Sequence, residues 1–69
     1  MLTEGERLQE AREAYEQVLA QNPTAGAGYA NLGVVLVKQG DLVAAEAAFR
    51  RALELDPRHG SAIHNLASL

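Results

Sequence analysis

The chain has 69 residues, no cysteine and a formal net charge of −3, from six basic and nine acidic residues. A chain of this length has room for one small domain with a limited core, and it has no disulfide to stabilise that core. The modest negative charge argues against a nucleic-acid or membrane-surface partner, and no apolar run is long enough to span a bilayer.

The first predicted helix covers residues 4–22. Thr3 and Glu6 have the spacing of a capping box, and Pro23 ends the helix. Its apolar side chains recur at helical spacing and form one stripe: Leu8, Ala11, Tyr15, Val18 and Leu19. We expect this stripe to lack a preceding partner helix.

A predicted helix pair follows. Tyr29, Leu32 and Leu36 have helical spacing, Gly40 can end this helix in a left-handed conformation, and Asp41 can cap the next helix. The second helix of the pair ends before Pro57 and has its own apolar stripe: Leu42, Ala45, Phe49, Ala52 and Leu53. On its outer side the sequence predicts two ion pairs at i, i+4: Glu46 with Arg50, and Glu54 with Arg58.

The last predicted helix opens at Ser61 and carries Ile63, Leu66 and Ala67, and we expect it to lack a following partner helix. One segment has an alternative interpretation. Gly33 to Val37 contains three valines, which favour a short buried strand. Nothing else in the chain alternates with a period of two, and a lone strand has no pairing partner, so the helix is preferred.

The chain contains an internal repeat. Ala11 corresponds to Ala45, an offset of 34 residues, and the same offset relates two series of residues. The first pairs Tyr15 with Phe49, Leu19 with Leu53 and Pro23 with Pro57; the second pairs Tyr29, Asn31, Leu32 and Gly33 with Ile63, Asn65, Leu66 and Ala67.

Three motifs have fixed positions inside this period: Asn31-Leu32-Gly33, Lys38-Gln39-Gly40-Asp41 and Ala52 to Pro57. With these motifs the chain closely resembles the tetratricopeptide repeat family. The resemblance implies an all-α fold, with antiparallel helix pairs stacked as a short right-handed solenoid of about four helices. Its parts would be the second helix of a partial repeat (4–22), a full repeat (26–59) and the first helix of another partial repeat (60–69). Small residues are expected where helices cross closely: Gly33, Ala45, Ala52 and Ala67.

The sequence offers little for catalysis. His59 and His64 are five residues apart, which does not place two imidazoles on one helix face for zinc. Ser61 and Ser68 have only His64 near them as a base, and no glycine-rich loop suited to phosphate is present. We therefore expect no enzyme activity, no metal and no cofactor.

In the resembled family, the first helix of each pair lines a concave groove. That implies a peptide-binding set here: Ala27, Ala30, Asn31, Val34, Val37, Lys38, Ser61, His64, Asn65 and Ser68. Asn31 and Asn65 stack one repeat above the other, an arrangement similar to the asparagine-ladder repeats of protein O-GlcNAc transferase. Two alternatives stay open: the asparagines could instead bond helix to helix, and the stripe Ala30, Val34 and Val37 could pack on a flanking helix rather than face a peptide.

The sequence thus predicts a protein-interaction scaffold, with a soluble, cytoplasmic location and a protein or peptide partner. A self-assembly module is the alternative, in which copies complete their repeats in trans, with a dimer preferred over an open head-to-tail assembly. Its interface would comprise Leu8, Ala11, Tyr15, Ile63, Leu66 and Ala67. A third possibility is a non-catalytic fragment of a larger enzyme or assembly.

Overall fold

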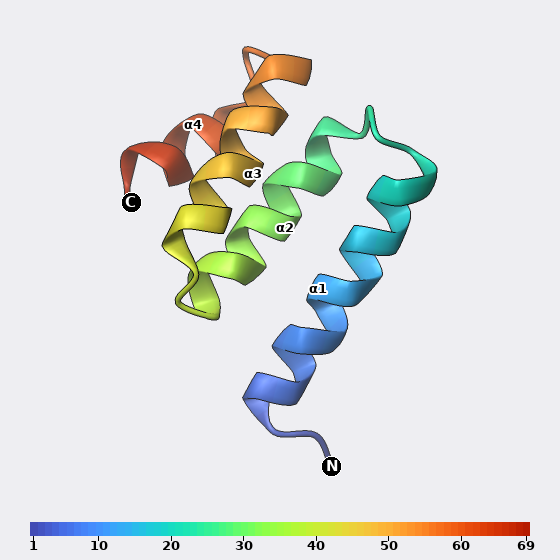
Figure 1. Ribbon diagram of the computed structural model, residues 1–69. Coiled ribbons are helices and arrows are strands. Elements are labelled where there is room, and N and C mark those ends of the chain that lie inside the picture. Colours follow the sequence, from blue (N-terminus) through green and yellow to red (C-terminus); the bar gives the residue numbers. More distant parts are fainter.

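The computed structural model describes all 69 residues and contains four helices and no strand. They are α1 (Glu4–Gln21), α2 (Gly26–Lys38), α3 (Leu42–Leu55) and α4 (Gly60–Ala67), and they follow one another across the molecule, with α1 at one edge and α4 at the other (Figure 1). The segment 33–37 lies inside α2, so the helical interpretation is confirmed and the alternative strand is excluded.

Side chains cap the starts of α1 and α3, as the sequence predicts. The Thr3 hydroxyl oxygen accepts a hydrogen bond from the Glu6 backbone N–H at 3.2 Å. Asp41 Oδ1 accepts one from the Ala44 N–H at 3.3 Å. Each cap satisfies a backbone donor that the helix itself leaves unpaired, so the first turn of each helix has a local reason to form.

Gly40 forms the turn between α2 and α3. Its φ of +83° lies in the left-handed region, where a side chain is disfavoured. The N–H of Gly40 bonds to the carbonyl of Val37 at 3.0 Å, and the N–H of Asp41 bonds to that of Leu36 at 2.9 Å. These two bonds close the end of α2 and turn the chain back, which makes α2 and α3 an antiparallel pair.

The start of α4 differs from the prediction. The helix begins at Gly60 rather than Ser61, and His59 is its cap residue. His59 Nδ1 accepts a hydrogen bond from the Ala62 N–H at 3.4 Å. Because an imidazole nitrogen can accept from the backbone as a hydroxyl does, His59 takes the capping role and moves the start of the helix earlier.

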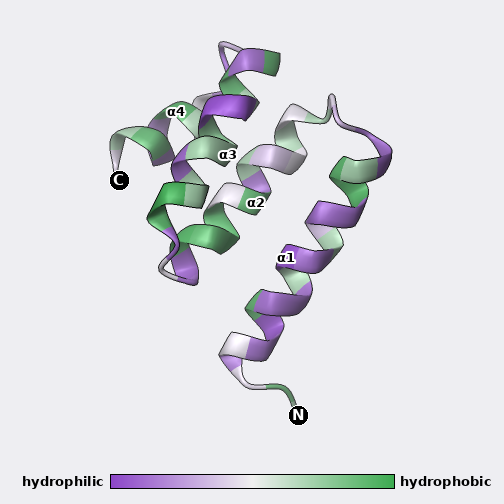
Figure 2. Cartoon of the chain, viewed as in Figure 1, coloured by the Kyte–Doolittle hydropathy of each residue, from purple (hydrophilic) through white to green (hydrophobic).

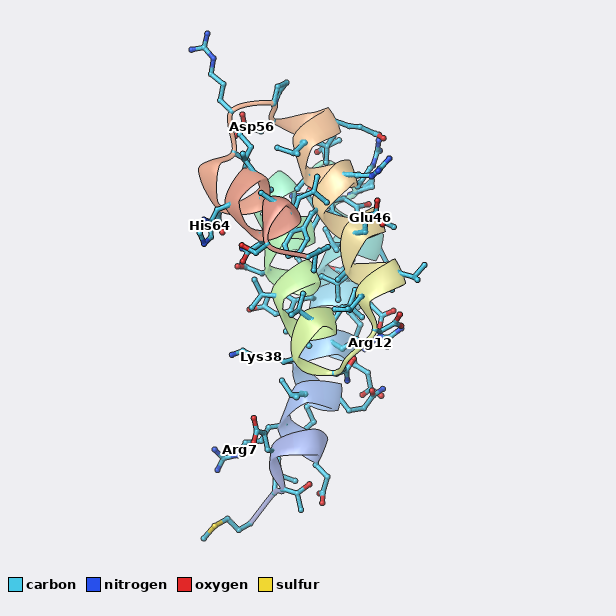
Figure 3. The ribbon with its side chains drawn as sticks, turned by 90° about the vertical axis from the view of Figure 1, so that its left-hand side faces the viewer. Arg7, Arg12, Lys38, Glu46, Asp56 and His64 are labelled. Atoms are coloured by element: carbon cyan, nitrogen blue, oxygen red, sulfur yellow. The ribbon has the colours of Figure 1, made fainter.

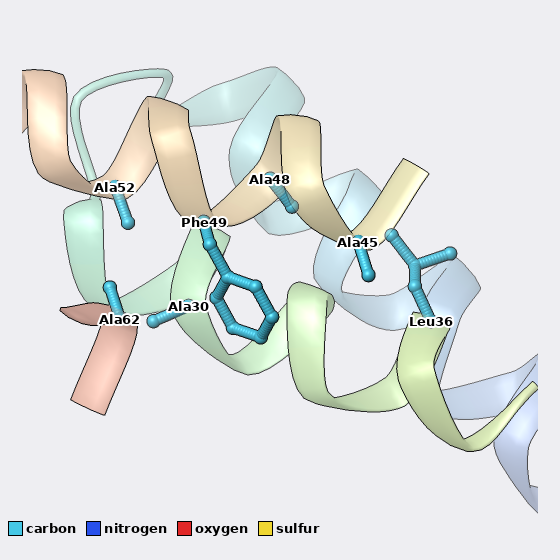
Figure 4. Close-up of a cluster of buried hydrophobic side chains, with 7 residues drawn as sticks. All are labelled: Ala30, Leu36, Ala45, Ala48, Phe49, Ala52 and Ala62. Carbon is cyan, nitrogen blue, oxygen red and sulfur yellow. The ribbon is translucent and has the colours of Figure 1, made fainter. Parts of the chain in front are cut away.

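The core lies where α3 is enclosed by α2 on one side and α4 on the other. It is a cluster of seven buried side chains in which Phe49 is the only large one that is fully enclosed (Figure 4). The others are small or aliphatic: Ala30, Leu36, Ala45, Ala48, Ala52 and Ala62. Alanines at these positions let three helices approach one aromatic ring closely.

One residue of the predicted α3 stripe lies outside this core. Leu42 is 50% exposed, whereas Ala45, Phe49 and Ala52 are fully buried. Leu42 is the first residue of α3, and it borders a surface hollow with Leu66 and Leu69 of the last segment. Leu42 therefore belongs to the predicted stripe by its spacing but is not buried, because α4 does not cover that end of α3.

The helix α1 contacts only α2. Only Leu19 among its residues is buried, and hydrophilic residues predominate along it (Figure 2). The shortest dimension of the molecule is 17 Å, and only ten of its 69 residues are buried. A layer this thin cannot enclose a large core, so packing between neighbouring helices must supply most of the stability.

Of the two ion pairs predicted on the outer side of α3, one forms. Arg50 Nη2 lies 2.6 Å from Glu46 Oε1. Glu54 instead pairs with Arg51 at 2.8 Å. The prediction of Glu54 with Arg58 is wrong because α3 ends at Leu55, so Arg58 is no longer on the helix face that carries Glu54.

Candidate binding surfaces

The helices α2 and α4 contact each other, and each contributes side chains to one side of the molecule (Figure 3). Figure 3 shows Lys38 of α2 and His64 of α4 on this side, and Arg12 of α1 and Glu46 of α3 on the opposite side. We call the first side the inner face and the second the outer face. The predicted groove residues all belong to α2 and to the segment from α4 to Ser68.

The two asparagines of the inner face are in different states. Asn65 donates through Nδ2 to the Ser61 carbonyl at 2.8 Å and to the Ser61 hydroxyl at 3.3 Å. Its Oδ1 remains able to accept. Asn31 is exposed, and its amide has no partner within the chain. Asn31 can therefore offer both donor and acceptor to a ligand, and Asn65 offers mainly an acceptor.

The predicted apolar floor is only partly available. Ala30 is 2% exposed and lies in the core cluster with Ala62, so the expectation that it faces a peptide is wrong. It is buried because the first turn of α4 packs over this part of α2. Val34 is half-buried against the core, and Val37 is 37% exposed. Of the two alternatives for this stripe, Ala30 follows the packing one, while Val37 is open to contact.

The remaining groove candidates are polar or small and lie at the surface. Ser68 donates its hydroxyl hydrogen to the His64 carbonyl at 2.9 Å, which ties it to its own helix. The others are exposed: Ala27, Lys38, Ser61 and His64. The accessible inner face is thus mostly neutral, with one amine and one imidazole as its only ionisable groups.

A hollow of about 300 Å³ on the outer side lies between α1, α2 and α3. Its apolar lining includes Leu32, Leu36 and Ala48. Sequence reasoning missed it, although a signal existed. The signal is the small apolar character of Ala44 and Ala47, which line the hollow. The equivalent residues of α1, 34 positions earlier, are the charged Glu10 and Glu13.

Two arginines border this outer hollow, and both already have partners. Arg12 donates to Gln39 Oε1 at 3.2 Å and lies 3.5 Å from Glu16 Oε1. Arg51 bonds to Glu54 and its guanidinium carbon is 5.9 Å from the centre of the Tyr29 ring. Two contacts raise the pKa of Arg51: the hydrogen bond with Glu54 has the larger effect, and the contact with Tyr29 has the smaller one. Since intramolecular acceptors occupy both guanidinium groups, we assign no ligand to this hollow.

Each edge of the helix layer presents an apolar face. On α1, which has a neighbour on one side only, Leu8, Ala11 and Tyr15 are half-buried and Val18 is 51% exposed. These four residues form the α1 edge face.

At the other edge, the α4 edge face consists of Ile63, Leu66, Ala67 and Leu69. Leu66 packs partly on the core, while Ile63 is 48% and Leu69 45% exposed. Ala67 was expected at a close helix crossing, but it is exposed.

No group of three or more histidine, aspartate and glutamate side chains is placed to hold a metal ion. No helix has the length and apolar character needed to cross a membrane. What the surface offers chemically is hydrogen bonding by amides on the inner face and apolar contact at the two edges.

Comparison with protein families gives one match: a tetratricopeptide repeat model covers residues 4–59, which is most of the chain. No curated protein and no solved structure matches the chain.

Proposed function

The chain belongs to the tetratricopeptide repeat family, a family of protein-interaction modules, and from this we propose that it is a scaffold that binds an extended peptide along its inner face. Stacked helical repeats present extended surfaces of this kind to their partners. The observation that carries the proposal is the exposed, unpaired amide of Asn31 on a helix that adjoins α4.

An extended peptide exposes alternating N–H and C=O groups, which match the donors and acceptor of an asparagine amide. Asn31 would contact one peptide unit through both kinds of group, and Asn65 would accept from another. The exposed part of Val37 would contact a peptide side chain. Lys38 and His64 lie at the margin of this surface, and the binding needs no catalytic group.

The expected affinity is modest. A hydrogen bond of this type contributes about 0.5–1.5 kcal/mol net, and three such bonds with a small apolar contact correspond to micromolar or weaker binding. The specificity of the scaffold for a partner would then depend on which peptide side chains fit beside Val37 and Lys38.

The test begins with a phage-displayed library of random linear peptides selected on the immobilised protein. Calorimetry on the best selected peptide follows, with Asn31→Ala, Asn65→Ala and, as a control on the outer face, Arg50→Ala. We expect Asn31→Ala, which removes two of these bonds, to raise Kd roughly 5- to 100-fold, Asn65→Ala to raise it less, and Arg50→Ala to leave it unchanged. The groove assignment is wrong if no peptide is selected, or if Arg50→Ala abolishes binding while both asparagine variants retain it.

A further inference from the structure

We propose that the two edge faces bind each other between copies of this protein, so that the α4 edge face of one copy packs against the α1 edge face of the next. This contact uses a surface separate from the peptide-binding inner face. The occupant of each face is thus a second copy of the same chain.

The pair α2 and α3 provides the template for this contact. The repeat offset of 34 residues relates Phe49 of α3 to Tyr15 of α1, and Gly33 of α2 to Ala67 of α4. The same offset relates the other residues of the two edge faces to residues inside the chain: Ala11 to Ala45, Val18 to Ala52, Ile63 to Tyr29, Leu66 to Leu32 and Leu69 to Val35. The pairing of α4 with α1 of a second copy therefore repeats a helix pair that already forms within one chain.

Exposure supports this equivalence on the α1 side. Ala45, Phe49 and Ala52 are fully buried because α3 has neighbours on both sides. Their counterparts on α1 have one neighbour fewer, and Val18 is accordingly 51% exposed. Apolar residues equivalent to those buried in α3 are thus present on α1, where a helix covers them on one side only.

The α4 side shows the same deficit. Val35 is 8% exposed in α2, and its counterpart Leu69 is 45% exposed. Beside it, Leu42, Val43 and Leu66 border a second hollow of about 340 Å³ between α3 and the end of the chain. This second hollow corresponds to the outer hollow one repeat earlier, because Leu66 is equivalent to Leu32 and Glu46 to Arg12. The outer hollow has α1 as a third wall, whereas no third helix lines the second hollow. A docked α1 would form that wall.

The geometry favours an open head-to-tail contact over a dimer by exchange of helices. The helices α1 and α4, which carry the edge faces, lie at opposite edges of the molecule (Figure 1), so one copy can use both at once with two different neighbours. Exchange would require the turn at Gly40 to open, with loss of its two closing hydrogen bonds. The head-to-tail contact leaves that turn folded.

The test is sedimentation equilibrium of the whole 69-residue chain from low to high micromolar concentration, with thermal melts over the same range. We expect a mass that grows with concentration and a Tm that rises with it by mass action. Val18→Glu and Ile63→Glu each place a charge in one edge face at a half-exposed site, and each should raise the dissociation constant at least about tenfold. Ala47→Glu is the matched control, because it adds the same charge to the outer face, where α1 already has Glu13.

Mixing the two variants gives the sharpest result. Val18→Glu retains an intact α4 edge face and Ile63→Glu an intact α1 edge face, so an equimolar mixture should form a one-to-one dimer that cannot grow. Formation of that dimer also shows that both variants are folded. Ala67→Gly should tighten association, because it restores the glycine that the template pair has against its aromatic ring, although glycine weakens the isolated helix.

The proposal is overturned by a wild-type chain that stays monomeric with a constant Tm. It is also overturned if Ala47→Glu dissociates the assembly as strongly as Ile63→Glu, or if the mixed variants stay monomeric. An Ala67→Gly chain that associates no more tightly than wild type would exclude the proposed register.

Discussion

The ring of Phe49 lies directly on the backbone of Gly33. A Cβ atom at Gly33 would be 2.5 Å from Cε1 of this ring and 2.8 Å from Cδ1 and Cζ, closer than real Cβ contacts permit. The glycine therefore sets how near α2 and α3 can approach, and the fully enclosed aromatic ring fills the space that its missing side chain leaves.

Gly33→Ala should destabilise the protein by about 1–3 kcal/mol, even though alanine is the better helix former. The added methyl group must displace a ring that is enclosed by three helices. Urea denaturation measures the change. Gly60→Ala is the control, since a Cβ there meets nothing within 4 Å, and it should be neutral or slightly stabilising. Equal effects of the two substitutions would show that the ring contact does not limit the packing.

Phe49→Ala should be far more costly than Tyr15→Ala, although the two residues are equivalent in the repeat. Removing a fully buried ring costs about 3–5 kcal/mol, which approaches the whole stability of a small domain. Tyr15 is half-buried, and its loss should cost about 1–2 kcal/mol. Thermal melts at low protein concentration, where association is minimal, distinguish the two. A Tyr15→Ala chain as unstable as Phe49→Ala would mean that α1 is integral to the core.

Gly40→Ala should destabilise the turn between α2 and α3 by about 1–2 kcal/mol, because φ is +83° there and an L side chain is disfavoured in that conformation. Gly40→Asn should cost less, since asparagine tolerates the left-handed region better. Because no atom lies within 4 Å of a Cβ at this position, crowding does not contribute and the difference reports backbone conformation alone. Chemical denaturation of both variants gives the comparison, and an asparagine variant worse than alanine would contradict it.

His59→Asp should stabilise α4 by about 0.5–1 kcal/mol. The present cap is a long 3.4 Å bond from the Ala62 N–H to an imidazole nitrogen, and aspartate is among the best capping residues. Slower hydrogen exchange at Ala62 and higher helix content would report the gain. His64→Asp makes the same chemical change in the last turn of the helix, away from the N-terminal cap, and should give no such gain. If both substitutions act alike, net charge rather than capping is responsible.

Local signals in the sequence were enough to predict the four helices, the turn between α2 and α3 at Gly40, and the helix caps at Thr3 and Asp41. Those features depend on the backbone preferences of a few adjacent residues, so they can be recognised without knowledge of the packing. The buried part of the α3 stripe, with Phe49 at its centre, was also predictable, because a helix with neighbours on both sides buries an apolar face.

The burial of individual surface candidates required the packed structure. The spacing of apolar residues assigns both Ala30 and Leu42 to an apolar stripe of their helix, yet one is 2% and the other 50% exposed. Periodicity assigns a residue to a face of its helix, but the position and length of the neighbouring helix decide whether that face is covered. The same holds for Arg51, which pairs with Glu54 because α3 ends before Arg58, and for the edge faces of α1 and α4, whose exposure depends on a neighbour being present on one side only.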